Sequence, residues 1–236
     1  MIAMVNTVPI KLLHGWPSAQ RSPLVKICGI TEPRLAEGTV AAGAQMVGVV
    51  HFPPSPRHLE AEAAREVAAA ARGAIVVALT VDASDDVLDR LMETVRPGGL
   101  QLHGKETPAR VAELAERYGV PVAKAFGVAS AEDLHAMAHY CALPVLDAKP
   151  PKNADRPGGH GGAFDWSLLD GLSETRPFML SGGLGPDNVA EAVRRVRPYA
   201  VDVSSKVETG GIKDLPKIEA FVSATRRAGG AAGPSD

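Results

Sequence analysis

Short apolar runs alternate with longer amphipathic segments along most of the chain. The run at residues 24–31 is apolar apart from Lys26 and Thr31 and passes into Gly29 after Cys28, which is typical of a buried strand that ends at a turn. Similar runs predict seven further strands, at residues 46–50, 74–81, 99–102, 120–126, 143–146, 178–180 and 201–203. Each run leads into a polar or glycine-rich turn.

The segments between the predicted strands favour helices over residues 32–44, 60–71, 84–95, 107–118, 130–140, 164–172, 186–196 and 214–227. Ser84 is expected to cap its helix, and Pro186 suits a first helical turn. Strands that alternate with helices indicate parallel pairing. Eight such units predict the α/β class and a single (β/α)8 TIM barrel, with an all-parallel, eight-stranded closed sheet.

The length of 236 residues and a hydrophobic fraction of 45% suit one domain of this kind. We expect the barrel to occupy residues 24–227. Residues 1–23 lack the pattern of a signal peptide and are expected to be either a disordered leader or the product of a start assigned too early, and residues 228–236 are expected to be a flexible tail. The sequence leaves open whether the protein is a monomer or a homodimer.

Charge and cysteine content exclude several classes of partner. A formal net charge of −2 offers no field for nucleic acid or a membrane surface, and no apolar run approaches the roughly 20 residues of a membrane span. Two cysteines are too few for a disulfide framework, which favours a cytoplasmic location. The sequence shows neither metal-ligand spacing nor a dinucleotide fingerprint, so we expect no cofactor and no metal.

The turns after the seventh and eighth predicted strands suit a phosphorylated small molecule. Gly182 and Gly183 let backbone N–H groups approach an anion closely, and Ser204 and Ser205 offer hydroxyl donors. In barrels of this kind, a phosphate site commonly lies at these two turns.

Cys28 and Asp147 are the candidates for acid–base chemistry because Cys28 ends one predicted strand and Asp147 directly follows another. Free thiols and carboxyls have pKa values of about 8.5 and about 3.9, so a base at neutral pH needs the first lowered and an acid needs the second raised. Lys26 could assist Cys28 or could neutralise a buried acid such as Asp202, and both options stay open. An inert buried thiol is the alternative for Cys28 and is the expectation for Cys141.

Other polar residues lie near the predicted strand ends. Arg57 follows three prolines, and a stiff loop would aim it at the pocket as a carboxylate clamp; by itself it fits a solvated loop arginine equally well. Gln101 and His103 share one face of a strand, where structural hydrogen bonding is expected. The long loop that begins at Asp147 suggests function, although His160 within it is expected to be exposed.

Several motifs together resemble those of the phosphoribosylanthranilate isomerase family. They are residues 26–31 (KICGIT), 55–57 (SPR), 101–104 (QLHG), 146–149 (LDAK), 164–166 (FDW), 181–184 (SGGL) and 202–205 (DVSS), in the family's order. The resemblance implies an aldose–ketose isomerase of tryptophan biosynthesis that acts without a cofactor. Its reaction is the Amadori rearrangement of N-(5-phosphoribosyl)anthranilate to 1-(2-carboxyphenylamino)-1-deoxyribulose 5-phosphate.

The resemblance also implies roles for individual residues. It gives Cys28 as general base, Asp147 as general acid and Arg57 as the ligand of the anthranilate carboxylate, with the two turns holding the phosphate. Lys206 stands where the family more often has glycine, and it would either add charge at the phosphate or strain the loop. His51 replaces a common aromatic residue.

Two other functions fit a phosphate-binding barrel. An aldolase could form a Schiff base through Lys149 or Lys26. A non-catalytic binding protein would be expected to lack Cys28, Asp147 or their geometry, but both residues are present.

Overall fold

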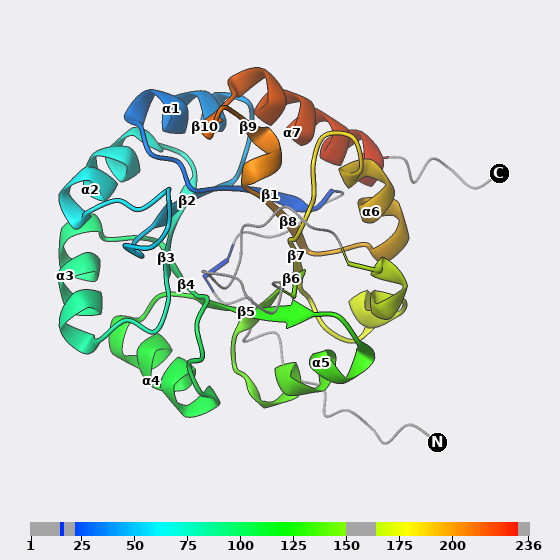
Figure 1. Cartoon of the computed structure of the whole chain (residues 1–236), viewed down its shortest axis with the longest axis horizontal. Helices are drawn as coiled ribbons and strands as arrows, with labels where there is room; N and C mark the ends of the chain where they lie inside the picture. The colour runs from blue at the N-terminus through cyan, green and yellow to red at the C-terminus, as the bar shows by residue number, and fades with distance from the viewer. Residues whose placement is uncertain (1–14, 17–21, 150–163, 231–236) are drawn as a thin grey trace.

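The computed structural model describes residues 15–16, 22–149 and 164–230. Eight parallel strands close into a barrel in chain order, and the helices surround it (Figure 1). The barrel strands are β1 (Leu24–Cys28), β2 (Met46–Val50), β3 (Ile75–Thr80), β4 (Gly99–Leu102), β5 (Val122–Val128), β6 (Leu143–Ala148), β7 (Met179–Leu180) and β8 (Ala200–Val203). The predicted fold class is confirmed.

The α-helices are α1 (Pro33–Ala41), α2 (Ala61–Ala70), α3 (Asp85–Val95), α4 (Pro108–Tyr118), α5 (Ala131–His135), α6 (Val189–Val196) and α7 (Leu215–Gly230). Short 3-10 turns occupy η2 (Ala136–His139), η3 (Trp166–Leu169), η4 (Leu172–Glu174) and η5 (Ser205–Val207). No helix in the described part of the chain is long and apolar enough to cross a membrane.

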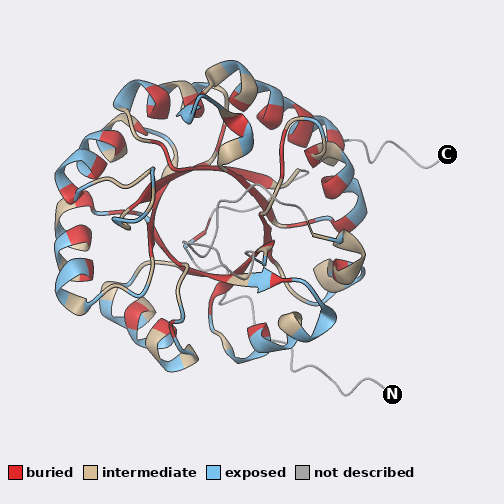
Figure 2. Cartoon of the chain, viewed as in Figure 1, coloured by how far each residue is buried: buried red, intermediate tan, exposed pale blue. Residues whose placement is uncertain are grey.

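Helix α4 shows how local sequence signals set the helix boundaries. The Thr107 hydroxyl accepts a hydrogen bond from the backbone N–H of Arg110 at 3.2 Å, and Pro108 follows at the first helical position. Gly119 ends the helix in a left-handed conformation that glycine adopts without strain. Between these caps, Val111 and Leu114 face the sheet. Figure 2 shows the same division in the surrounding helices, with buried faces toward the barrel.

Alternation along the strands divides the core into two layers. Outward-facing residues such as Val25 and Ile27 pack beneath the helices, and inward-facing residues such as Leu24 and Met46 fill the barrel. Full burial of one such side chain stabilises the fold by about 1.5–3 kcal/mol. Towards the carboxyl ends of the strands, the inward-facing positions become polar and line a pocket.

Several predicted elements differ in detail. The helix expected over residues 130–140 breaks after α5 into a 3-10 turn, and the one expected over residues 164–172 is replaced by η3 and η4, separated by Gly171 at φ +78°. The helix expected from Pro186 begins at Val189, because the Asn188 side chain bonds Gly185 and Gly183 and holds a turn there. Ser84 makes no capping hydrogen bond.

The structure adds features at both ends of the predicted barrel. Trp16, within the predicted leader, is buried against the inner core, and α7 continues to Gly230 past the predicted start of the tail. An additional antiparallel hairpin, β9 (Glu208–Thr209) and β10 (Ile212–Lys213), follows β8. The rest of the predicted leader, residues 1–14 and 17–21, lies outside the described residues, as do residues 231–236.

Candidate active site

A pocket lies at the carboxyl ends of the barrel strands. It brings together all seven residues predicted from the sequence, which are Cys28, Arg57, Asp147, Gly182, Gly183, Ser204 and Ser205. Gln101, His103, Ser181, Asp202 and Lys206 add polar groups, and Val50, Phe52, Leu79 and Val81 add apolar ones. Because strand ends from around the barrel converge here, residues far apart in sequence face one ligand.

Cys28 is the inward-facing residue at the end of β1, and it is buried. Its carbonyl oxygen accepts a hydrogen bond from the Ser204 hydroxyl at 3.0 Å, which ties the end of β1 to the turn after β8. Burial raises the pKa of the Cys28 thiol, although the nearby Lys26 ammonium opposes this effect. The thiol is therefore protonated at neutral pH unless a further positive charge arrives.

Asp147 faces the pocket from β6 and is largely buried. Its Oδ1 atom accepts a hydrogen bond from the backbone N–H of Ala148 at 2.8 Å, and its Oδ2 atom lies 3.7 Å from Nε2 of His103. Burial, followed by the charges of Lys124 and Lys26, lowers the pKa of His103 to about 4. His103 is thus a neutral neighbour of this carboxyl at physiological pH.

Arg57 is held at the pocket edge by Glu208. Its Nε and Nη2 atoms donate to the two carboxylate oxygens of Glu208 at 2.7 and 2.8 Å. These bonds raise the pKa of Arg57, so its positive charge is secure. Gly29, at φ +78°, makes room for the arginine, because a Cβ there would lie 2.4 Å from Cδ of Arg57. The glycine of the KICGIT motif is therefore required for the close approach of the Arg57 side chain to Gly29.

The turns after β7 and β8 line the opposite side of the pocket. Gly182 and Gly183 both have positive φ, at +78° and +66°. The Ser204 hydroxyl donates to the backbone carbonyl oxygen of Cys28, so direct donation to a phosphate would require that bond to break. Lys206 lines the pocket and is not among the described non-glycine residues with positive φ, so the expected alternative of loop strain at Lys206 is wrong.

Sequence reasoning missed Glu208 and Lys213, which the β9–β10 hairpin supplies. Lys213 is buried, and its ammonium donates to the carbonyl and hydroxyl oxygens of Ser204, both at 3.2 Å, and to the Glu208 carboxylate. The hairpin thus contacts both sides of the pocket. A signal was present in the sequence, since Gly210 and Gly211 form a two-residue Gly–Gly turn between residues that pair as short strands.

Three other sequence expectations concern residues outside the pocket lining. Lys26 is buried and ion-paired with Asp202, and Lys149 pairs with Asp133 on the outside of the barrel, so neither lysine is presented for a Schiff base. Cys141 is exposed, which corrects the expectation that it is buried, because it follows the last turn of η2 at the surface. His160 and most of the long loop after β6 lie outside the described residues.

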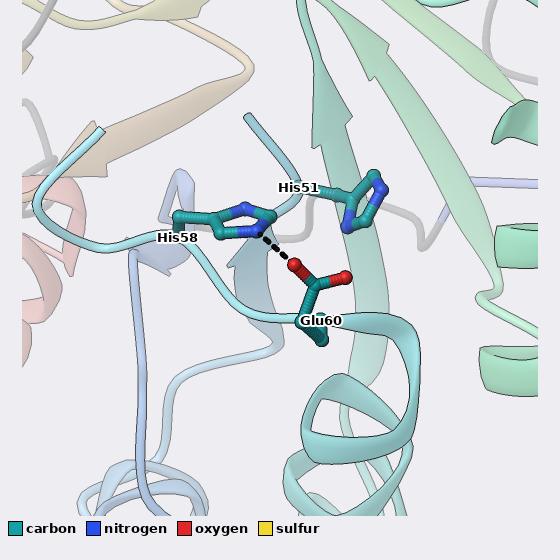
Figure 3. Close-up of side chains that lie close together, drawn as sticks. All are labelled: His51, His58 and Glu60. Carbon is teal, nitrogen blue, oxygen red and sulfur yellow. Dashed lines mark hydrogen bonds and ion pairs between the residues drawn. The ribbon is translucent and has the colours of Figure 1, made fainter. Parts of the chain in front are cut away.

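One group in the described part of the chain has the composition of a metal site. Ligand atoms of His51, His58 and Glu60 lie within 4.8 Å of one another, and Figure 3 shows the Glu60 carboxylate beneath the two rings. Nδ1 of His51 lies 2.8 Å from the carbonyl oxygen of Leu59, and Nε2 of His58 lies 3.0 Å from Glu60. Both rings are therefore engaged in hydrogen bonds that fix the loop carrying Arg57.

Comparison with known proteins gives a consistent result. A family model described as N-(5'-phosphoribosyl)anthranilate (PRA) isomerase matches residues 25–224. The curated N-(5'-phosphoribosyl)anthranilate isomerase of Bradyrhizobium sp. (strain ORS 278) is 53% identical over 212 residues, which cover 88% of this chain and 97% of the relative.

Solved structures agree in fold and sequence. Monomers made from the dimeric phosphoribosylanthranilate isomerase of Thermotoga maritima superpose with a TM-score of 0.76 at 35% identity, covering 87% of this chain and 99% of theirs. A second isomerase structure was solved in complex with reduced 1-(o-carboxyphenylamino)-1-deoxyribulose 5-phosphate. Its TM-score is 0.75 at 35% identity, and the match covers 87% of this chain and 99% of that one.

Proposed function

The chain belongs to the N-(5'-phosphoribosyl)anthranilate isomerase family, and on this premise we propose which of its residues carry out the reaction. It is an enzyme of tryptophan biosynthesis that catalyses an Amadori rearrangement of the aldose–ketose type. The substrate carries a carboxylate at one end, a phosphate at the other and the reacting ribose between them. The residues must therefore fix both ends and move protons in the middle.

Asp147 and Cys28 are the proposed acid and base. Asp147 protonates the ribose ring oxygen, so that the ring opens to an iminium ion. The iminium acidifies the proton on C2, and Cys28 removes it to give an enolamine, which tautomerises to the ketone. The positive iminium also favours the Cys28 thiolate, which burial alone disfavours. Proton removal thus becomes easier after ring opening.

Arg57 and the two turns are the proposed anchors. Glu208 occupies the Nε–Nη2 edge of the Arg57 guanidinium, which leaves Nη1 and the second Nη2 hydrogen for the substrate carboxylate. Gly182, Gly183, Ser204 and Ser205 hold the phosphate, with the positive charge of Lys206 close by. Two fixed ends orient the ribose between Cys28 and Asp147.

One observation carries this proposal: the acid, the base and both anchors line one pocket. The test follows the decay of phosphoribosylanthranilate fluorescence on addition of wild type, Cys28→Ser or Asp147→Asn. We expect each substitution to lower kcat by about 10²- to 10⁴-fold with little change in KM, because these groups act mainly in the transition state.

Matched surface variants control for the substitutions themselves. Cys141→Ser and Asp170→Asn make the same chemical changes at exposed positions, and both should retain wild-type turnover. Full activity of Cys28→Ser or Asp147→Asn would refute the assigned roles while leaving the family membership intact.

Arg57→Ala tests the carboxylate anchor separately. Loss of the guanidinium should raise KM at least tenfold, because a charge-assisted hydrogen bond contributes about 1.5–3 kcal/mol. Steady-state kinetics with the same fluorescence signal give the value. An unchanged KM would show that the substrate carboxylate binds elsewhere.

We propose a cytoplasmic location and a monomer or homodimer. The acid–base role of Cys28 needs a free thiol, which a reducing compartment maintains. The Thermotoga maritima relative is dimeric in origin and was also solved as monomers. Cell fractionation tests the location, and light scattering distinguishes a 24.6 kDa monomer from a dimer.

A further inference from the structure

We propose that Lys26 is a positioning residue for Cys28, whose thiolate shares the Lys26 ammonium with Asp202. This inference rests on the proposed role of Cys28 as general base. Sequence reasoning left open whether Lys26 assists Cys28 or neutralises Asp202, and the structure indicates that one ammonium does both.

Strand register places the three groups together. Lys26 on β1 lies directly opposite Asp202 on β8, and Nζ donates to Oδ1 of Asp202 at 3.0 Å. Cys28 is two residues further along β1, so its side chain points to the same interior face of the barrel. Lys26 is completely buried, so water does not screen its charge. The other Asp202 oxygen accepts from the Ser181 hydroxyl at 3.4 Å, which helps to fix the carboxylate.

Gly48 on β2 leaves the space in which the thiol and the ammonium approach. It pairs with Cys28 across the β1–β2 ladder. A Cβ at Gly48 would lie 3.0 Å from Sγ of Cys28 and 3.2 Å from Nζ of Lys26. Both atoms therefore border one small volume over Gly48, which a side chain at this position would occupy.

The charges around Cys28 act in opposite directions. Burial raises the pKa of the thiol, Lys26 and then Lys213 lower it, and Asp202 raises it further. Burial lowers the pKa of Lys26, but attraction to Asp202 and then Cys28 raises it overall, so Lys26 stays an ammonium. Arg57 also faces Cys28 from the loop after β2, and Asp147 and the neutral His103 share the pocket. Removal of the Lys26 charge should thus raise the pKa of the Cys28 thiol, and removal of the Asp202 charge should lower it.

Alkylation kinetics of the full chain test this directly. In a Cys141→Ser background Cys28 is the sole cysteine, and mass spectrometry follows its reaction with iodoacetamide from pH 6 to 10. We expect Lys26→Met to raise the pH midpoint of the alkylation rate by about one pH unit, with roughly tenfold slower alkylation at neutral pH. Asp202→Asn should move the midpoint down, and Lys26→Arg should stay near the Cys141→Ser parent.

A purely structural Lys26 would destabilise the fold without these opposite shifts. Thermal unfolding followed by circular dichroism shows whether each variant folds. If Lys26→Met does not fold, the single variants Asp202→Asn and Lys26→Arg provide the test. Superimposable profiles, or shifts of the same sign, overturn the proposal. Alkylation requires no substrate, so it tests the effect of Lys26 on the Cys28 thiol whether or not Cys28 is the catalytic base. The pH profile of kcat tests the role of Cys28 as the base separately.

Discussion

Gly182 shows how closely single residues are fitted around the proposed acid. A Cβ at this position would lie 2.5 Å from the backbone nitrogen of Ala148 and 2.8 Å from Oδ1 of Asp147. No side chain fits between the turn after β7 and the end of β6. The glycine is needed for this approach as well as for its positive φ.

Gly182→Ala should therefore damage catalysis more than stability. Displacement of Asp147 should lower kcat by roughly 10²-fold, since small misplacements of a catalytic group have effects of this size. Gly171→Ala is the matched control, because Gly171 has the same φ of +78° but no atom near its Cβ position. Both variants carry the conformational cost, of about 1 kcal/mol. Equal kcat values for the two would contradict the crowding argument.

The lowered pKa of His103 should make the folded protein less stable at acid pH. Its pKa is about 4 in the folded state against a usual 6.5, so the unfolded chain binds more protons between these values. Stability should fall as the pH drops from 6.5 towards 4, by at most about 3 kcal/mol from this group. His103→Gln should flatten that portion of the curve, measured as the free energy of urea unfolding at each pH. A curve parallel to wild type would show that His103 is not buried in its neutral form.

The sequence allowed the pocket residues to be predicted but not their partners. Cys28, Asp147 and the glycine turns lie at strand ends, and the barrel topology alone brings strand ends together. The pairing of Arg57 with Glu208 joins residues 151 positions apart and depends on where a short hairpin folds back. No local pattern encodes such a pairing.

At the scale of elements, hydrophobic periodicity performed best where burial is complete. The barrel strands were predicted to within a few residues because both of their faces are apolar over most of their length. The two helices expected between β5 and β7 were wrong in extent and type, although β6 between them was predicted. Helix α5 has only five residues, and none of them is buried. A segment that hardly contacts the core has no amphipathic stripe to identify it.

The β9–β10 hairpin is the element that links the two anchors. Glu208 should keep Arg57 extended towards the substrate, so Glu208→Gln should raise KM about tenfold and change kcat much less. Steady-state kinetics measure both constants. Glu174→Gln provides the control, because Glu174 pairs with Arg197 at the surface. A fall in KM would instead show that Glu208 competes with the substrate for the guanidinium.

At the scale of the molecule, the two ends of the barrel have different tasks. The carboxyl end holds polar groups in a pocket, whereas the inner core towards the other end consists of apolar residues such as Leu24, Met46 and Met179. Trp16 packs against this inner core and is 6% exposed. Its ring lies so close to Gly99 that a Cβ there would be 2.9 Å from Cη2.

Trp16→Ala should therefore lower stability and spare catalysis. The substitution leaves a cavity against the inner core, and a loss of about 3 kcal/mol in the free energy of urea unfolding is expected. The kcat and KM values should stay at wild-type levels, because the change lies outside the pocket lining. Val87→Ala, at a partly exposed position on α3, should change stability by less than about 0.5 kcal/mol. A loss below about 1 kcal/mol for Trp16→Ala would show that the segment before β1 does not support the barrel, and altered kinetics would show that the two ends are coupled.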